Sequence, residues 1–293
     1  MKGGYLTGVT LASLAGFFWG SMGIAAQYLM QQCAFDVMDL VSLRLAGAGV
    51  LLLAFMKLRG EEIVAPLLRD KGWVSILIYG LGMLGIQLTF FLSIAASNAA
   101  TAALMVTTGS LFVTAWTAFS ERRAITGREW ICLALAIIGV GLIVTKGRLD
   151  VLDLSISGCL WGITSAVCGA FCTIQPRAIL RRVPVGVVVG WGMTIGGFAL
   201  STICPPDVLA IDWTPVTTSL YLYIAVFGTV AAFCCYLGSL RYVPAPVTSL
   251  LAAFEPLSAV VLGVLLLGLS LNAIEITGIG LIFVMVFLLS RRG

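Results

Sequence analysis

Ten stretches of about 20 mostly apolar residues follow one another along this chain of 293 residues, and they constrain its fold more than any other feature. Apolar residues make up 60% of the chain and charged residues only 10%, which is less charge than a water-soluble domain carries. A helix of about 20 residues spans the roughly 30 Å hydrocarbon core of a bilayer. The sequence therefore predicts an all-α polytopic membrane protein with ten transmembrane helices.

The predicted helices are joined by short loops. They cover residues 6–30, 37–56, 73–96, 99–119, 129–145, 154–176, 183–204, 220–240, 245–267 and 273–289. The first run lacks the small-residue cleavage pattern of a signal peptide, so we expect it to be a retained helix. No loop is long enough to hold a soluble catalytic domain. We therefore expect a protein that is not an enzyme and has no catalytic residues.

Basic residues predict the orientation in the membrane. Fourteen Lys and Arg residues fall on the same side as the N-terminus, and only Lys146 and Arg148 fall on the other side. Cytoplasmic loops collect Lys and Arg, so we expect a multi-pass protein of the plasma (inner) membrane with both termini in the cytoplasm. The net charge of +4 follows from this topology and gives no reason to expect a nucleic-acid partner. The partner that this topology predicts is the lipid bilayer.

The ten helices divide into two sets of five. The motif G-x-x-W-G opens both sets, at Gly16, Trp19 and Gly20 and again at Gly158, Trp161 and Gly162. Because five is odd, the first helices of the two sets must cross in opposite directions. We therefore predict two inverted five-helix repeats, at residues 1–147 and 148–293. Inverted repeats with a site near the midplane are typical of alternating-access transporters.

Glu255 lies in the middle of the apolar run 245–267 and is followed by Pro256. A charge at the bilayer centre costs about 2.5–3.5 kcal/mol on insertion scales, so this side chain should face protein or water. One interpretation is a ligand for a substrate amine or a proton. The other is a neutral carboxyl that bonds to a neighbouring helix and steadies the backbone at Pro256.

Arg44 is the only basic residue inside a predicted helix, about two turns from its outer end. Its guanidinium could bind a substrate carboxylate in a fork geometry. Alternatively, the side chain could reach outward to Asp39 or to lipid headgroups. If Arg44 and Glu255 open on one cavity, they suit a zwitterion such as an amino acid.

Three motifs make the chain resemble the EamA family of the drug/metabolite transporter superfamily. They are the duplicated Trp-Gly pairs, the segment 97–101 that enters the fourth helix, and the segment 254–257 in the ninth. The resemblance implies ten helices in two inverted repeats, a plasma-membrane location, and transport of amino acids, amines, carboxylates or related metabolites, often outward. Two positions depart from the family pattern: Gly109 stands in the Pro place of the first repeat, and Gly268 in the Glu place of the second.

Polar and aromatic side chains within the helices are the candidates for a substrate site. The predicted substrate-binding residues are Trp19, Gln27, Arg44, Gln87, Asn98, Thr108, Trp161, Ser165, Tyr236 and Glu255. For most of them the alternative is packing or a hydrogen bond between helices. Gly109 and Pro256 are predicted to bend their helices. Thr108 aligns with Glu255 between the repeats, so the acid has no symmetric partner.

Histidine is absent, which excludes a His-ligated metal, and no P-loop is present for ATP hydrolysis. We expect no cofactor and no metal. The favoured hypothesis is a secondary active transporter, predicted to export a small metabolite by alternating access around a midplane cavity, with protons as a second candidate ligand. The alternative is a non-transporting membrane receptor or lipid-binding protein.

Overall fold

The computed structural model describes residues 2–33, 35–68, 72–97, 99–151, 155–209, 211–267 and 272–290. Every regular element in these ranges is helical. Within the described residues, seven helices are long and apolar enough to cross a membrane: Gly4–Met30, Val37–Leu58, Gly72–Ala96, Gly127–Thr145, Ile156–Arg177, Val185–Ile203 and Pro215–Ser239. Two shorter apolar helices cover Leu104–Ser120 and Ala273–Leu288. The prediction of an all-α membrane protein is confirmed, and seven of the ten predicted crossings reach the length of a full span.

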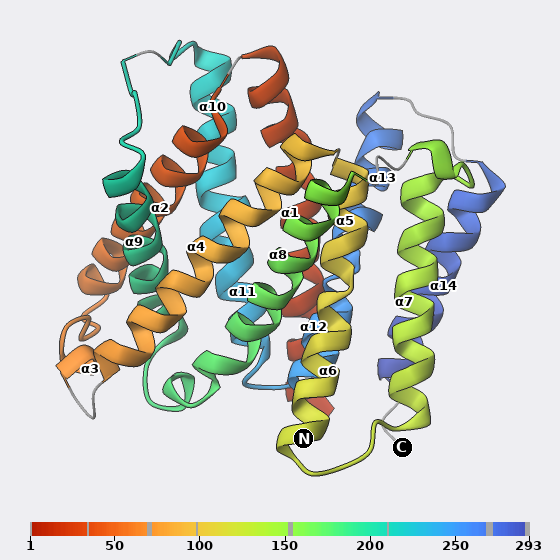
Figure 1. Cartoon of the computed structure of the whole chain (residues 1–293). Helices are drawn as coiled ribbons and strands as arrows, with labels where there is room; N and C mark the ends of the chain where they lie inside the picture. Colours follow the sequence, from red (N-terminus) through yellow and green to blue (C-terminus); the bar gives the residue numbers. More distant parts are fainter. Residues whose placement is uncertain are drawn as a thin grey trace.

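Long, unbroken helices form most of the bundle (Figure 1). They are α1 (Lys2–Gln32), α2 (Val37–Leu58), α4 (Gly72–Ala96), α7 (Gly127–Thr145), α8 (Ile156–Ile174), α9 (Val185–Ile203) and α14 (Ala273–Ser290). Short elements lie in the connections: α3 (Ala65–Leu68), η2 (Leu149–Val151), η3 (Gln175–Arg177) and η4 (Ile179–Arg181). The two ends of the chain lie on the same side of the bundle (Figure 1).

Polar residues just before the helices fix where several of them begin. The Asp36 carboxylate accepts from the backbone N–H of Met38 at 2.7 Å and starts α2. Thr126 and Glu129 form a capping box at the start of α7. These caps satisfy N–H groups that the first helical turn leaves without partners. The capped ends therefore mark where each apolar run meets the polar loops.

The fourth and ninth crossings are each broken into two helices. The first consists of α5 (Ala99–Thr107) and α6 (Gly109–Ser120), and the second of α12 (Ala245–Leu251) and α13 (Phe254–Leu267). Tight turns of the i to i−3 type lie at both breaks, as when Thr108 N–H donates to the Met105 carbonyl at 3.0 Å and Glu255 N–H to the Ala252 carbonyl at 2.9 Å.

Gly109 and Pro256, predicted to bend these helices, lie where the second half-helices begin. Gly109 is the first residue of α6, and a Cβ there would lie 3.2 Å from the Ala166 carbonyl of α8. Pro256 is the third residue of α13, in the first turn, where a missing N–H removes no helical bond. Both breaks therefore occur just before the two residues.

The eighth crossing contains a wide π-helical segment. It runs from α10 (Pro215–Tyr223) through the π-helix η5 (Ile224–Ala231) to α11 (Ala232–Ser239). The Thr229 hydroxyl donates to the Ile224 carbonyl five residues earlier, at 2.8 Å. Such segments are rare and occur frequently at functional sites.

The two halves of the chain pack against each other helix by helix. α2 packs on α9, α7 on α14 and α6 on α12, so corresponding crossings of the two halves meet. α1, the first helix of the first half, packs on α13 and α11 of the second half. Its counterpart α8, the first helix of the second half, packs on α5 and α4, which are the corresponding crossings of the first half. In Figure 1, α2 and α9 lie at one edge of the bundle and α7 and α14 at the other, with the broken helices between them. The broken helices therefore lie where both halves contribute.

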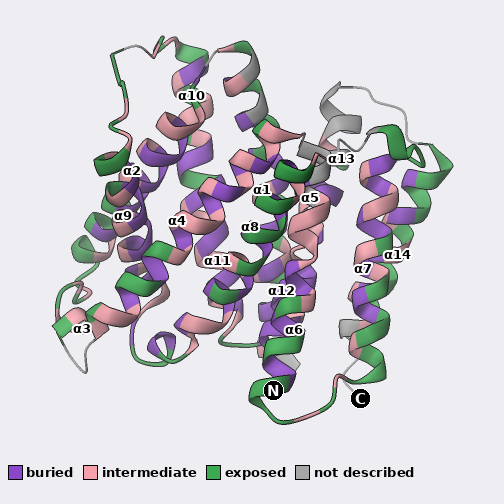
Figure 2. Cartoon of the chain, in the orientation of Figure 1, coloured by how far each residue is buried: buried purple, intermediate pink, exposed green. Residues whose placement is uncertain are grey.

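The outer faces of the bundle are apolar. Figure 2 shows exposed positions along the outward sides of the helices. They include large apolar side chains such as Leu51, Trp116 and Phe283, each more than half exposed. Exposed apolar surface on this scale fits contact with lipid and not with water.

Candidate functional site

A cavity of about 120 Å³ lies between the two halves of the chain. Its described lining comes from α1, α4, α6, α8, α11 and α12, together with residues at the two helix breaks. Among the described residues that line it, Glu255 is the only acidic or basic one. The volume exceeds the space that a single water needs and suits a small ligand.

The structure brings six of the twelve predicted residues to this cavity. They are Trp19, Gln87, Gly109, Ser165, Tyr236 and Glu255. Trp19 comes from α1 and Tyr236 from α11, and their rings pack 5.1 Å apart between centroids. Residues from both halves therefore meet at one place, although they are separated by more than 200 positions in the sequence.

The Glu255 carboxylate faces hollow space. The side chain is partly accessible although it lies inside the bundle, and it lines both the main cavity and an adjoining space of about 30 Å³. No described residue donates a hydrogen bond to its carboxylate, while the Ser258 hydroxyl donates to its backbone carbonyl at 2.9 Å. Its place in the first turn of α13 lets the positive end of the helix dipole stabilise a negative charge.

Two further polar residues that line the cavity come from α4. Gln87 is buried, and no hydrogen bond links its side-chain amide to the described part of the chain. The Tyr79 hydroxyl is buried and likewise has no partner within the described ranges. A buried polar group without a partner costs about 1–3 kcal/mol, so these groups are suited to bind a ligand or water.

Other lining groups are already bonded to the protein. The Ser165 hydroxyl donates to the Ile86 carbonyl at 3.1 Å, and the Tyr236 hydroxyl shares a hydrogen bond of 3.0 Å with Thr173. These bonds tie α8 to α4 and to α11. They hold the walls of the cavity in place, while Glu255, Gln87 and Tyr79 offer the free polar atoms.

Several predicted residues lie away from the cavity. Trp161 is 40% exposed on the outer side of α8, although its motif duplicates that of Trp19. Thr108 lies at the break before α6, and its hydroxyl donates to the Met105 carbonyl at 2.6 Å. Pro256 lines only the smaller adjoining space. Asn98 and the side chain of Gln27 fall outside the described residues.

Arg44 is fully buried behind the cavity wall, with 0% of its surface exposed. Its Nη1 lies 3.0 Å from the sulfur of Met22, which lines the cavity, and its Cζ lies 5.1 Å from the centroid of the Phe91 ring. Within the described ranges no ion pair joins Arg44 to Asp39. The interpretation in which Arg44 reaches outward to Asp39 or to headgroups does not match this position.

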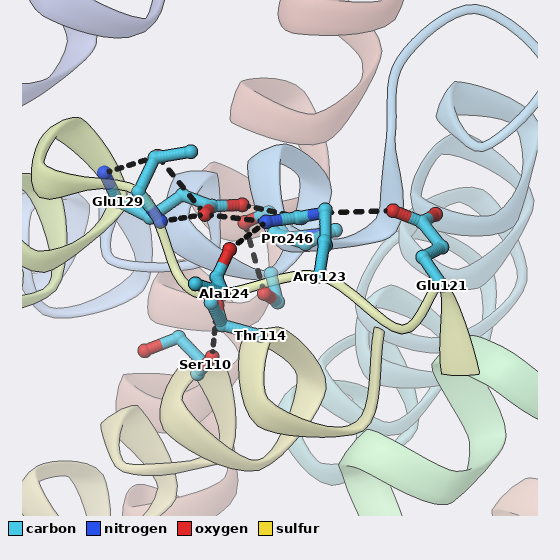
Figure 3. A network of polar contacts seen from close by, with 9 residues as sticks. Ser110, Thr114, Glu121, Arg123, Ala124, Glu129 and Pro246 are labelled. Atoms are coloured by element: carbon cyan, nitrogen blue, oxygen red, sulfur yellow. Dashed lines mark hydrogen bonds and ion pairs between the residues drawn. The ribbon is translucent and has the colours of Figure 1, made fainter. Parts of the chain in front are cut away.

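An ionic network closes the loop between α6 and α7. Arg123 donates to Glu121 at 2.8 Å and to both oxygens of Glu129 at 2.7 and 2.8 Å, so its guanidinium lies between the two carboxylates (Figure 3). These carboxylates raise the pKa of Arg123 above its usual range. On the opposite side of the bundle, Lys146 pairs with Glu275 at 3.3 Å and joins the end of α7 to the start of α14.

Comparison with known families accounts for the way in which the helices of the two halves contact each other. The profile of the EamA-like transporter family matches residues 6–145 and again residues 156–291. The chain belongs to the EamA-like transporter family. Because the family unit occurs twice, corresponding helices of the two halves make corresponding contacts. The predicted family resemblance is confirmed.

Curated relatives of this EamA-like chain are transporters and not enzymes. YicL of Salmonella typhimurium, an uncharacterized inner membrane transporter, is 34% identical over 278 residues that cover 94% of this chain and 93% of YicL. The threonine/homoserine exporter RhtA of Escherichia coli is 27% identical over 82% of this chain and 77% of RhtA. A solved crystal structure with 16% identity covers 96% of each chain at a TM-score of 0.79, which shows the shared fold. This chain is therefore an EamA-like membrane transporter.

Tyr79 is the lining residue that the sequence reasoning missed most clearly. It sits among Ile, Leu and Gly residues in α4, where its ring alone gives no sign of which way it points. Ser110 and Ser249 also line the cavity. A signal for Ser249 was available, because it lies three residues before the break in the ninth crossing, and interrupted helices in corresponding positions of two repeats point to a transporter's binding site.

Proposed function

We propose that this EamA-like chain is a secondary active transporter that exports small metabolites such as amino acids, amines or carboxylates by alternating access. The observation that supports this best is the cavity between the two halves, lined at both helix breaks and carrying unpartnered polar groups. Broken helices near the midplane leave backbone and side-chain groups free to bind a substrate. The name of RhtA, a threonine/homoserine exporter, favours amino acids among these classes.

The predicted ligand contacts divide by chemistry. Glu255 is proposed to bind a substrate amine or a proton, since its carboxylate faces the cavity with no described partner. The amide of Gln87 and the hydroxyl of Tyr79 are proposed to bond to polar groups of the substrate. Trp19 and Tyr236 form an aromatic wall that also suits a cationic amine.

Alternating access is proposed to come from rocking of the two halves about the α2–α9 and α7–α14 contacts. With both termini in the cytoplasm, the Arg123 network lies on the cytoplasmic side and the Lys146–Glu275 pair on the outer side. The Lys146–Glu275 pair joins the two halves, and its Lys146 side is half exposed, so this pair can break and re-form during a cycle. Energy is proposed to come from a proton gradient or from the membrane potential, which supplies about 2.3 kcal/mol per charge per 100 mV.

Flux in proteoliposomes tests the proposal, with a matched pair of tryptophan variants from the two repeats. Labelled L-threonine, other amino acids, amines and carboxylates are measured under imposed pH and voltage gradients. We expect flux of at least one class, a loss of ten-fold or more in Trp19→Ala, and near-normal flux in Trp161→Ala, because only Trp19 lines the cavity. Background flux for every class refutes transport, and equal losses in both variants refute this cavity as the site.

A further inference from the structure

Arg44 carries two donor groups with no partner among the described residues. Within the described ranges its Nε and Nη2 atoms are buried and unbonded, and Nη1 makes its one hydrogen-bond contact with the thioether sulfur of Met22. The face of the guanidinium is covered by Phe91. A thioether is a weak acceptor, and an aromatic ring offers no lone pair along the guanidinium edge.

The free donors lie on one edge of the guanidinium. Nε and Nη2 point in parallel from that edge, which is the spacing that a carboxylate meets with its two oxygens. Arginine stays protonated in proteins, so the guanidinium is charged although it is buried. A buried charge without a partner costs free energy of folding. An anion of matching shape removes this cost.

Met22 separates this charge from the central cavity. Its side chain lines the cavity and also contacts Arg44, so one flexible side chain lies between them. Gly228 of η5 makes room for Met22, because a Cβ there would lie 2.6 Å from the sulfur. Methionine has three rotatable bonds and readily changes its conformation. A rotation of Met22 therefore frees Nη1 towards the cavity. Nη1 and the unpartnered Nη2 form the end of the guanidinium, where two N–H groups also meet the two oxygens of a carboxylate.

We propose that Arg44 is a carboxylate subsite beside the cavity, covered by Met22 when no ligand is bound. It rests on the proposed transport function and narrows the substrate class to molecules with a carboxylate, with the amine held by Glu255. A zwitterionic amino acid has both groups.

Thermal stability of the purified full-length protein in detergent tests the subsite with matched probes. The acids are acetate, glycine and L-threonine, and the controls at equal ionic strength are chloride, ethanolamine and L-threoninol, which lack the carboxylate. A ligand that binds only the folded state raises the melting midpoint. We expect each acid to raise the midpoint above its control in the unaltered protein, and the difference to vanish in Arg44→Gln.

Equal midpoints for acids and controls in the unaltered protein overturn the subsite, as does an acid-specific shift that persists in Arg44→Gln. If Arg44→Gln does not fold, Arg44→Lys keeps the charge and loses the fork. It should bind acids at least ten-fold more weakly, and unchanged affinity overturns the proposal. Flux measurements separate the two proposals. Acid binding without flux supports the subsite and refutes transport, whereas flux without acid-specific binding supports transport and refutes the subsite.

Discussion

The crossing of α2 and α9 depends on glycine at position 197. A Cβ added there would lie 2.2 Å from the backbone nitrogen of Ala46 and 2.6 Å from its Cα. Carbon atoms pack at about 3.5–4.0 Å, so the two helices must separate by roughly 1 Å or more. The obstructing atoms are backbone and cannot rotate away. Gly197→Ala should therefore loosen one of the main contacts between the two halves.

Two opposing effects decide the sign of the change. Alanine is favoured over glycine in a helix by about 1 kcal/mol, whereas overpacking typically costs about 1–3 kcal/mol. We expect overpacking to exceed the propensity gain, because α2 and α9 must move as whole helices. The upper part of the overpacking range leaves a net loss of about 1–2 kcal/mol. At about 2–4 °C per kcal/mol for chains of somewhat smaller size, the melting midpoint should fall by roughly 2–8 °C.

Gly23→Ala is the matched control, since no atom lies within 4 Å of the Cβ position at Gly23 in α1. The midpoint of each purified variant is measured in detergent by thermal denaturation. Gly23→Ala should keep or slightly raise the midpoint. If Gly197→Ala melts at the same temperature as Gly23→Ala, the close α2–α9 crossing described above is wrong.

Three further predictions concern the cavity and the ionic network in the loop between α6 and α7. Glu255→Gln should flatten the pH dependence of flux if the carboxyl carries protons, and a pH profile that matches the unaltered protein contradicts that role. Gly169→Phe should abolish flux and leave the melting midpoint nearly unchanged, because Gly169 lines the cavity with no atom within 4 Å of its Cβ position; retained flux would count against the cavity. Arg123→Gln should lower the free energy of unfolding by less than about 1 kcal/mol, since the ion pairs are partly exposed, and denaturation showing a loss of several kcal/mol would disagree.

The helices were predictable because burial in lipid demands long apolar runs. The caps at Asp36 and Thr126 lie where the apolar runs begin, so those helix starts were also within reach. The breaks at Thr108 and Ala252 were signalled by the neighbouring Gly109 and Pro256. The sequence did not show whether each helix bends or ends and starts again, because both outcomes have the same local sequence.

The site was only partly predictable, because repetition in sequence does not make two positions equivalent in space. Trp19 and Trp161 occupy the same motif, yet only Trp19 faces the cavity. Burial cost required Glu255 to face protein or water, and the sequence left both possibilities open. For Arg44, the outward alternative depended on an open path to Asp39, and only the packing of α1, α2 and α4 shows that the side chain is enclosed.

Access to one cavity position from both sides of the membrane tests the transport mechanism most directly. Gly169→Cys is introduced into a variant in which the eight native cysteines are replaced, and a membrane-impermeant thiol reagent is applied to right-side-out and inside-out vesicles. Gly127→Cys, in the loop-proximal first turn of α7, serves as a control that should react only from the cytoplasmic side. Alternating access predicts labelling of Gly169→Cys from both sides. Labelling from one side only, or from neither, would contradict it.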